Sequence, residues 1–219
     1  MRLSSSYSDD TVEKLLTSKD TCELVEFLRE RHEERYFQPL RLMGNAAGNE
    51  AGYGFAMMSL CCLLIETFQC YREGLPTTSG KECKVLLEIE KRESVPTEYS
   101  LEHIPQPQKG AGEAIFKNFF KEQKEFFPKV DGKEFYKSIR CGLLHQALTK
   151  NNWRIRKNCA TLCDPNGQEI DRDLFAEALI RTFAAYLTEL RSKSKSWSDD
   201  LWQKAARKIW WLVRISKKW

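Results

Sequence analysis

The sequence has few residues of the kinds that bind metal ions. It contains three histidines, and no second pair of cysteine or histidine residues accompanies Cys159 and Cys163 at the spacing of a zinc site. Among the eight cysteines, Cys61 and Cys62 are adjacent in an apolar run, which is typical of small buried hydrophobic residues. We therefore predict no metal and no cofactor, reduced cysteines and a cytoplasmic location.

A long uninterrupted apolar run is also absent. The longest run, residues 55–65, is broken by Ser59 and closed by Glu66, so it is shorter than the roughly 20 residues that cross a bilayer. The first residues, "MRLSSSYSDDTVEKLL", lack the apolar segment of a signal peptide. The sequence therefore predicts neither a membrane span nor a secretion signal.

The composition is that of a folded chain with an uneven charge. Apolar residues make up 42% of the 219 residues, which is enough for the core of one domain. The net charge is +4, but residues 150–219 carry 15 Lys and Arg against 8 Asp and Glu, a surplus of +7, and residues 1–149 carry −3. A basic C-terminal third is compatible with a polyanion such as RNA, and equally with a solvated helix surface.

Helical patterns account for most of the chain, so the predicted fold class is all-α. Pro39 is expected just past the end of the first helix, and the stretches 40–54 and 94–112 are expected to be a connection and a loop or lid. Residues 151–170, with the turn sequence "DPNG", predict a short β-hairpin. The predicted helices are 20–37, 53–71, 80–92, 113–127, 131–148, 171–191 and 199–219.

The predicted domain organisation is simple. One helical domain covers residues 1–192, with its hairpin at about 153–170, and a basic amphipathic helix over 193–219 packs on the same domain. That helix has three alternatives: contact with RNA, an interfacial position on a membrane, or packing through its apolar face. RNA contact would use Lys204, Arg207, Lys208 and Arg214, and packing would use Leu201, Ala205, Ile209, Leu212 and Val213.

One polar stripe interrupts the apolar helix at 53–71. Ser59, Cys62, Glu66 and Gln69 recur at steps of three and four residues, so they line one helix face. The Glu66 carboxylate therefore lies either at the surface or in a polar cleft.

The motif segment, residues 131–148, contains "RCGLLH" between apolar residues, with Asp131 as its expected N-cap. This phrase matches the R-x4–6-H signature of the HEPN superfamily, and "EFYKSIRCGLLHQ" resembles the corresponding helix of bacterial members. The apolar helix "GYGFAMMSLCCLLIETFQ" resembles their companion helix. The resemblance implies a HEPN-like helical bundle, a homodimer and a metal-independent endoribonuclease. Many active members carry a polar residue directly after the arginine, where this chain has Cys141.

The resemblance implies that Arg140 and His145 are catalytic. An imidazole can take the proton of the RNA 2′-hydroxyl, and a guanidinium can hold the phosphate by two hydrogen bonds. Possible residues lining the site are Glu66, Tyr136, Cys141 and Gln146. A cationic surface for RNA would be extended by Arg154, Arg156 and Lys157. An antitoxin or sensor protein is a further possible partner, and a role as a toxin or in phage defence is implied only by the family.

The spacing of the pair presents a geometric difficulty. Residues five apart lie roughly 140° apart around a regular α-helix, so Arg140 and His145 do not share a face. The helix is irregular at Gly142, or Arg140 curls round, or a second subunit completes the site, as the resemblance implies. A thiol dyad of Cys141 and His145, a non-catalytic HEPN-like scaffold that binds nucleotide or RNA, and an unrelated helical interaction protein are the rival interpretations.

Overall fold

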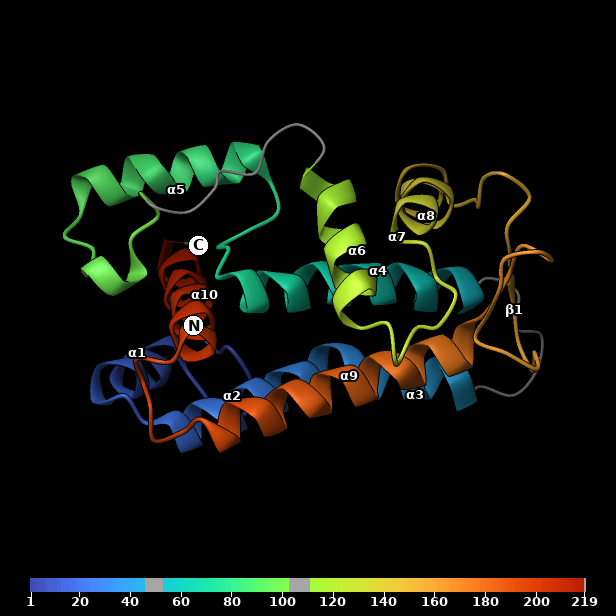
Figure 1. The fold of residues 1–219 in the computed structure, drawn as a ribbon. Helices are drawn as coiled ribbons and strands as arrows, with labels where there is room; N and C mark the ends of the chain where they lie inside the picture. Colours follow the sequence, from blue (N-terminus) through green and yellow to red (C-terminus); the bar gives the residue numbers. More distant parts are fainter. Residues whose placement is uncertain (46–52, 103–110, 219) are drawn as a thin grey trace. The chain divides into compact units, whose positions relative to one another are not determined.

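The computed structural model describes residues 1–45, 53–102 and 111–218, and this part of the chain is predominantly α-helical, as predicted (Figure 1). It divides into two compact units, which are described separately. The terminal unit contains Met1–Glu34, Thr67–Ala111 and Ala185–Trp219, and the motif unit contains Arg35–Glu66 and Gly112–Ala184. Helices α4 (Tyr53–Glu73) and α9 (Arg172–Ser192) contribute residues to both units.

In the terminal unit, side-chain caps fix where several helices begin. Ser8 accepts a hydrogen bond from the backbone N–H of Thr11 at the start of α1 (Asp9–Ser18), and Asp20 does the same at the start of α2 (Thr21–His32). Ser79 accepts from Glu82 N at the start of α5 (Gly80–Arg92), and the predicted helix at 80–92 is confirmed. The short 3₁₀ helix η2 (Thr97–Tyr99) follows.

The C-terminal helix α10 (Asp200–Lys218) buries its apolar face within the terminal unit. Trp202 donates from Nε1 to Leu190 O at 2.9 Å, and Trp211 donates from Nε1 to Tyr99 O at 3.0 Å. Both indole rings are thus satisfied and fully buried, as the packing alternative requires. The buried residues of α10 are Leu201, Trp202, Ala205, Ala206, Ile209, Trp210, Trp211 and Val213; Leu212 is partly exposed.

The cations of α10 have neighbours within the chain. Lys208 donates to the carbonyl of Pro76 at 2.6 Å, and burial lowers its pKa. Lys204 pairs with Asp200 at 2.6 Å, and burial lowers the pKa of Arg207. These three side chains therefore do not form the open cationic row that contact with RNA would use.

In the motif unit, Pro39 does not follow the end of a helix, so that prediction is wrong. The π-helical turn η1 (Glu33–Phe37) leads from α2 directly into α3 (Gln38–Asn45), which contains Pro39 in its first turn. A proline lacks the N–H that would bond to the preceding turn, and a wide π turn before it accommodates the lost bond. Residues 40–45 are therefore helical, and residues 53–54 of the predicted connection begin α4. Residues 46–52 lie outside the described residues, as does most of the predicted lid, at 103–110.

The predicted hairpin is present as part of a slightly larger sheet. Strands β2 (Cys163–Asp164) and β3 (Glu169–Asp171) pair antiparallel around the "DPNG" turn. Strand β1 (Arg154–Arg156) pairs in parallel with the other edge of β3, so the sheet has a third strand beyond the hairpin. The prediction missed β1 because a parallel strand is joined to its partner by a crossover, here through β2, and not by a tight turn.

A cluster of phenylalanines forms the core beside the motif segment. Phe135 stacks on Phe175 with ring centroids 5.2 Å apart, and Phe120 lies 5.0 Å from Phe135. Phe120 comes from helix α6 (Ala111–Glu122) and Phe175 from α9. Helix α6 and the turn after it supply the other rings, Phe116, Phe119 and Phe127. These contacts hold the start of the motif segment in place from three sides.

One described helix, α4, has the length and hydropathy of a helix that crosses a membrane. Half of its most apolar window is buried, and core helices of that kind meet the same criterion. No disulfide joins any of the eight cysteines, all of which belong to the described residues.

Candidate functional site

The motif segment is a helix with an irregular middle. Asp131 accepts a hydrogen bond from Glu134 N at 2.7 Å, which confirms the expected N-cap. Helix α7 (Gly132–Phe135) continues into the π-helical turn η3 (Tyr136–Arg140) and then into α8 (Cys141–Gln146). The wide turn thus ends at the motif arginine itself. Single π turns inside helices are often found at functional sites.

Arg140 forms an ion pair with Glu66 of α4. Its Nε lies 2.9 Å from Glu66 Oε1, and the two side chains are only 20% and 12% exposed. The surface alternative for Glu66 is therefore wrong, because the carboxylate faces the guanidinium. Burial acts to lower the pKa of Arg140, but the hydrogen bond and charge of Glu66 outweigh it and raise the pKa.

The ion pair with Glu66 uses only the Nε atom of the Arg140 guanidinium. Nε donates to Glu66, while the two terminal amino groups of Arg140 have no hydrogen-bond acceptor within the described ranges. The guanidinium also lies over the ring of Tyr136, with Cζ 5.5 Å from the ring centroid. Glu66 and Tyr136 therefore fix the orientation of a fork whose outer amino groups can still bind an anion.

Tyr136 and Cys141 lie against each other beside this arginine. Burial, followed by the neighbouring Cys141, raises the pKa of the Tyr136 hydroxyl, while the positive charge of Arg140 acts in the opposite direction. A Cβ atom on Gly112 would lie 2.8 Å from the Tyr136 hydroxyl oxygen, so α6 approaches this tyrosine closely. The structure therefore brings three predicted residues, Glu66, Tyr136 and Cys141, next to Arg140.

His145 is exposed in the last turn of α8 and is not in that group. Helix α8 is regular at Gly142 and the irregular turn η3 ends at Arg140, so the first geometric alternative is wrong. The guanidinium of Arg140 is bonded to Glu66, and among the described residues no hydrogen bond joins it to His145. Across the described part of the chain, no hydrogen bond or ion pair involves the His145 ring. Gln146 is exposed beside it. The completion of the site by a second subunit stays a prediction.

Gly142 allows the loop after α8 to pack closely against the motif segment. The chain reverses at Ala147, whose φ is +52°, and Leu148 N returns to Gly142 O at 3.4 Å. A Cβ atom on Gly142 would lie 2.2 Å from the carbonyl oxygen of Leu148. A glycine is therefore required at this position so that the loop can fold back over the motif segment.

Sequence reasoning missed a hydrogen-bond network that anchors the same loop. Ser138 is fully buried and donates to Glu134 Oε1 at 2.5 Å. Asn151 donates to Ser138 Oγ at 2.8 Å, and Trp153 donates from Nε1 to Glu134 Oε1 at 3.1 Å. The four-residue spacing of Glu134 and Ser138 is visible in the sequence, but the contribution of the loop depends on the tertiary fold.

Glu134→Gln is expected to destabilise the protein by about 1–2 kcal/mol at pH 7, because a charged acceptor of several hydrogen bonds is replaced by a neutral one. The hydrogen bond from Ser138, followed by those from Trp153 and Asn151, outweighs burial and lowers the pKa of Glu134 below its ordinary value of 4.5. Since the folded pKa is the lower one, the stabilisation is complete above pH 4.5 and is lost as the pH falls through the folded value.

Urea unfolding at several pH values measures the difference in unfolding free energy between the wild type and Glu134→Gln. The stability difference should shrink as the pH falls below 4.5. Glu125→Gln, at an exposed carboxylate of the same unit, is the matched control and should change stability by less than about 0.5 kcal/mol. A difference that persists unchanged in acid would contradict the assignment.

The basic residues predicted to bind RNA are paired with acidic residues of the same unit. Arg154 and Arg156 lie 3.2 and 3.5 Å from Glu169 Oε1, because β1 and β3 pair in register. Lys157 donates to the carbonyl of Gly44 and lies 3.9 Å from Asp173. The cationic surface around β1 is therefore partly neutralised, although both arginines are exposed.

The described residues include no group of three or more His, Cys, Asp or Glu side chains arranged to hold a metal ion. Comparisons with protein-family models, with curated proteins and with solved structures gave no significant match.

Proposed function

We propose that the protein is a metal-independent endoribonuclease of the HEPN type, which acts through Arg140 and His145 at a cleft between two subunits. One observation carries the proposal: Glu66 holds the Nε edge of Arg140, while the terminal amino groups have no acceptor among the described residues. A guanidinium fixed in this way is suited to a phosphate group, which it can bind by two parallel hydrogen bonds.

The chemistry requires few components. RNA supplies its own nucleophile, the ribose 2′-oxygen, which attacks phosphorus as the bond to the 5′-oxygen breaks. The products are a 2′,3′-cyclic phosphate and a 5′-hydroxyl. His145 would take the proton of the 2′-hydroxyl, the departing 5′-oxygen would gain a proton from water, and Arg140 would stabilise the charge that develops on the phosphate oxygens. The exposed position of His145 at the end of α8 is compatible with contact with a polymer.

The dimer is part of the proposal because of the helix geometry. Five residues of regular helix separate Arg140 and His145 by roughly 140° around the axis and about 7.5 Å along it. A twofold axis near α8 would bring the arginine of one subunit to the histidine of the other. An antitoxin or sensor partner and a role in defence are supported only by the resemblance of "EFYKSIRCGLLHQ" to the family.

The test is cleavage of labelled RNA in the presence of EDTA. The wild type should cleave and leave cyclic phosphate ends, whereas Arg140→Ala and His145→Ala should each lose at least about a hundredfold in rate. Arg140→Lys should also lose most of the activity, because an ammonium keeps the charge but not the fork. Arg181→Ala, an exposed arginine of α9, is the control for a change in overall charge. Equal activity in all these preparations would indicate a contaminating nuclease and overturn the proposal.

A second candidate is a HEPN-like protein that binds RNA or nucleotide without cleaving it. The observation that favours it is that Arg140 is bonded to Glu66 and that no hydrogen bond joins it to His145 among the described residues. Fluorescence anisotropy with labelled RNA distinguishes the two. Binding that depends on Arg140, together with intact RNA in the wild-type reaction, would establish this candidate in place of the nuclease.

A further inference from the structure

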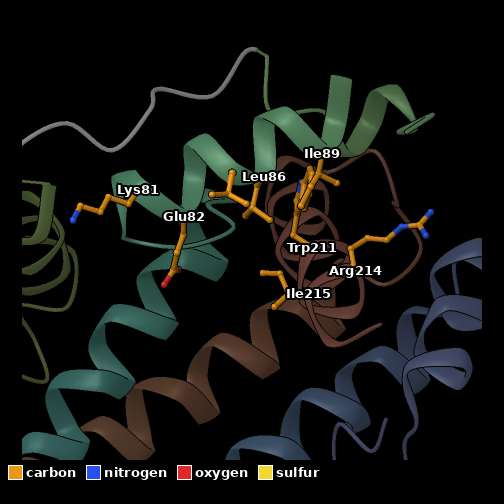
Figure 2. A pocket seen from close by; sticks show the side chains of 8 residues that line it. Lys81, Glu82, Leu86, Ile89, Trp211, Arg214 and Ile215 are labelled. Atoms are coloured by element: carbon orange, nitrogen blue, oxygen red, sulfur yellow. The ribbon is translucent and has the colours of Figure 1, made fainter. Parts of the chain in front are cut away.

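An apolar groove lies between α5 and α10 in the terminal unit, apart from the residues of the proposed nuclease site. It has a volume of about 430 Å³, which is within the range of pockets for small molecules. Figure 2 shows Leu86 and Ile89 of α5 gathered with Trp211 and Ile215 of α10. Val85 also lines the groove. We refer to the space lined by these five residues as the α5–α10 groove.

The groove leaves apolar surface uncovered by any described residue. Val85 is 61% exposed, which makes it one of the most exposed large apolar side chains of the described chain. Trp211, by contrast, is fully buried and is fixed by its hydrogen bond to Tyr99 O. The groove therefore combines a rigid floor with an open apolar wall, an arrangement that favours burial of an alkyl chain.

Arg214 lies at one end of the groove and lacks an anion. Its Nε is buried and has no hydrogen-bond acceptor among the described residues, and its guanidinium lies over Trp210, with Cζ 4.8 Å from the ring centroid. No ion pair of Arg214 occurs in the described ranges. Because Nε is shielded, an anion at this end of the groove would be held by the positive charge and the terminal amino groups of Arg214, which point outward from the apolar side chains.

The other charged residues around the groove determine at which end an anionic group is favourable. Lys81 lies at the opposite end, and Figure 2 shows its ammonium and the Arg214 guanidinium directed away from the apolar side chains. The carboxylate of Glu82 accepts a hydrogen bond from the Thr77 hydroxyl at 2.6 Å and would repel an anion near it. The Arg214 end is therefore the favourable position for an anionic head group.

We propose that the α5–α10 groove binds a free single-chain amphiphile with a carboxylate head, such as a medium-length fatty acid. The alkyl chain lies against Leu86, Ile89 and Trp211, and the carboxylate bonds to Arg214. The binding is reversible, and it is independent of the nuclease activity proposed above.

Isothermal titration of the full-length protein with dodecanoate, below the concentration at which it forms micelles, tests this. Dodecanol is the matched uncharged probe, and it should bind at least tenfold more weakly than dodecanoate. Arg214→Gln should weaken dodecanoate binding at least tenfold and leave dodecanol binding unchanged, because a charge-assisted hydrogen bond is lost. Val85→Asp should weaken the binding of both probes, and it should fold normally because this residue is exposed.

The control is Leu42→Asp, which places the same charge at an exposed leucine of α3 in the motif unit and should not change binding. Circular dichroism should show that each variant is folded. Equal affinity for dodecanoate and dodecanol, or an unchanged affinity in Arg214→Gln, overturns the assignment of the head group. Absence of dodecanoate binding overturns the site. Binding only to vesicles of phosphatidylglycerol would mean a membrane-docking surface, and would also overturn it.

Discussion

A mixture of Arg140→Ala and His145→Ala subunits is expected to regain about a quarter of the wild-type rate of RNA cleavage, although neither variant is active alone. In a twofold dimer whose sites combine an arginine from one subunit with a histidine from the other, a mixed dimer contains one intact site and one site that lacks both groups. Random mixing makes about half of the dimers mixed. The reason to expect sites of this kind is that residues five apart on a regular helix such as α8 lie roughly 140° apart, while Arg140 is bonded to Glu66.

The measurement uses two affinity tags, so that co-expressed mixed dimers can be purified from the two parent dimers. Purified mixed dimers should cleave at about half of the wild-type rate, and light scattering should give the mass of a dimer. Mixed dimers as inactive as the parents would show that each site belongs to one chain. If wild-type protein cleaves RNA as a monomer, the dimer part of the proposed function is wrong even if Arg140 and His145 are both required.

Phe175→Ala is expected to destabilise the protein by about 3–5 kcal/mol, the cost of removing a fully buried phenylalanine that leaves a cavity. Phe175 is completely buried, stacks on Phe135 at 5.2 Å and contacts Phe127 at 5.1 Å. Phe135 directly precedes η3, so the loss should also loosen the turn that carries Arg140.

Urea unfolding followed by circular dichroism measures the free energy of unfolding. The matched control is Phe126→Ala, because Phe126 lies in the same region but is partly exposed, and it should lose about 1 kcal/mol or less. A cost for Phe175→Ala similar to that of the control would mean that the phenylalanine cluster repacks around the cavity, and that it does not fix the motif segment.

Local rules predicted the elements that depend on neighbouring residues. Asp131 was identifiable as an N-cap because a capping side chain acts within three residues of itself. The turn at "DPNG" was predictable for the same reason, and the β2–β3 hairpin forms around it. The predominance of helix also followed from the spacing of apolar residues along the chain.

The features that could not be predicted depend on contacts between distant segments or on small departures from regular helix. Arg140 and Glu66 are 74 residues apart, so the polar stripe of α4 suggested a special face but not its partner. Glu169 neutralises Arg154 and Arg156 because of the register of β1 and β3, which no local pattern specifies. The π turns η1 and η3 have no sequence signature strong enough to distinguish them from ordinary helix.

The π turn η3 has a consequence for how sequences of this kind should be aligned. A single wide turn is equivalent to one additional residue in an otherwise continuous helix, so the positions before it and after it differ in phase by about 100°. An alignment anchored at Asp131 would assign Arg140 to the wrong face if the other protein lacks the extra residue. Register should therefore be counted backward from the glycine of α8, which the returning loop constrains, and insertions should be permitted only between residues 136 and 140.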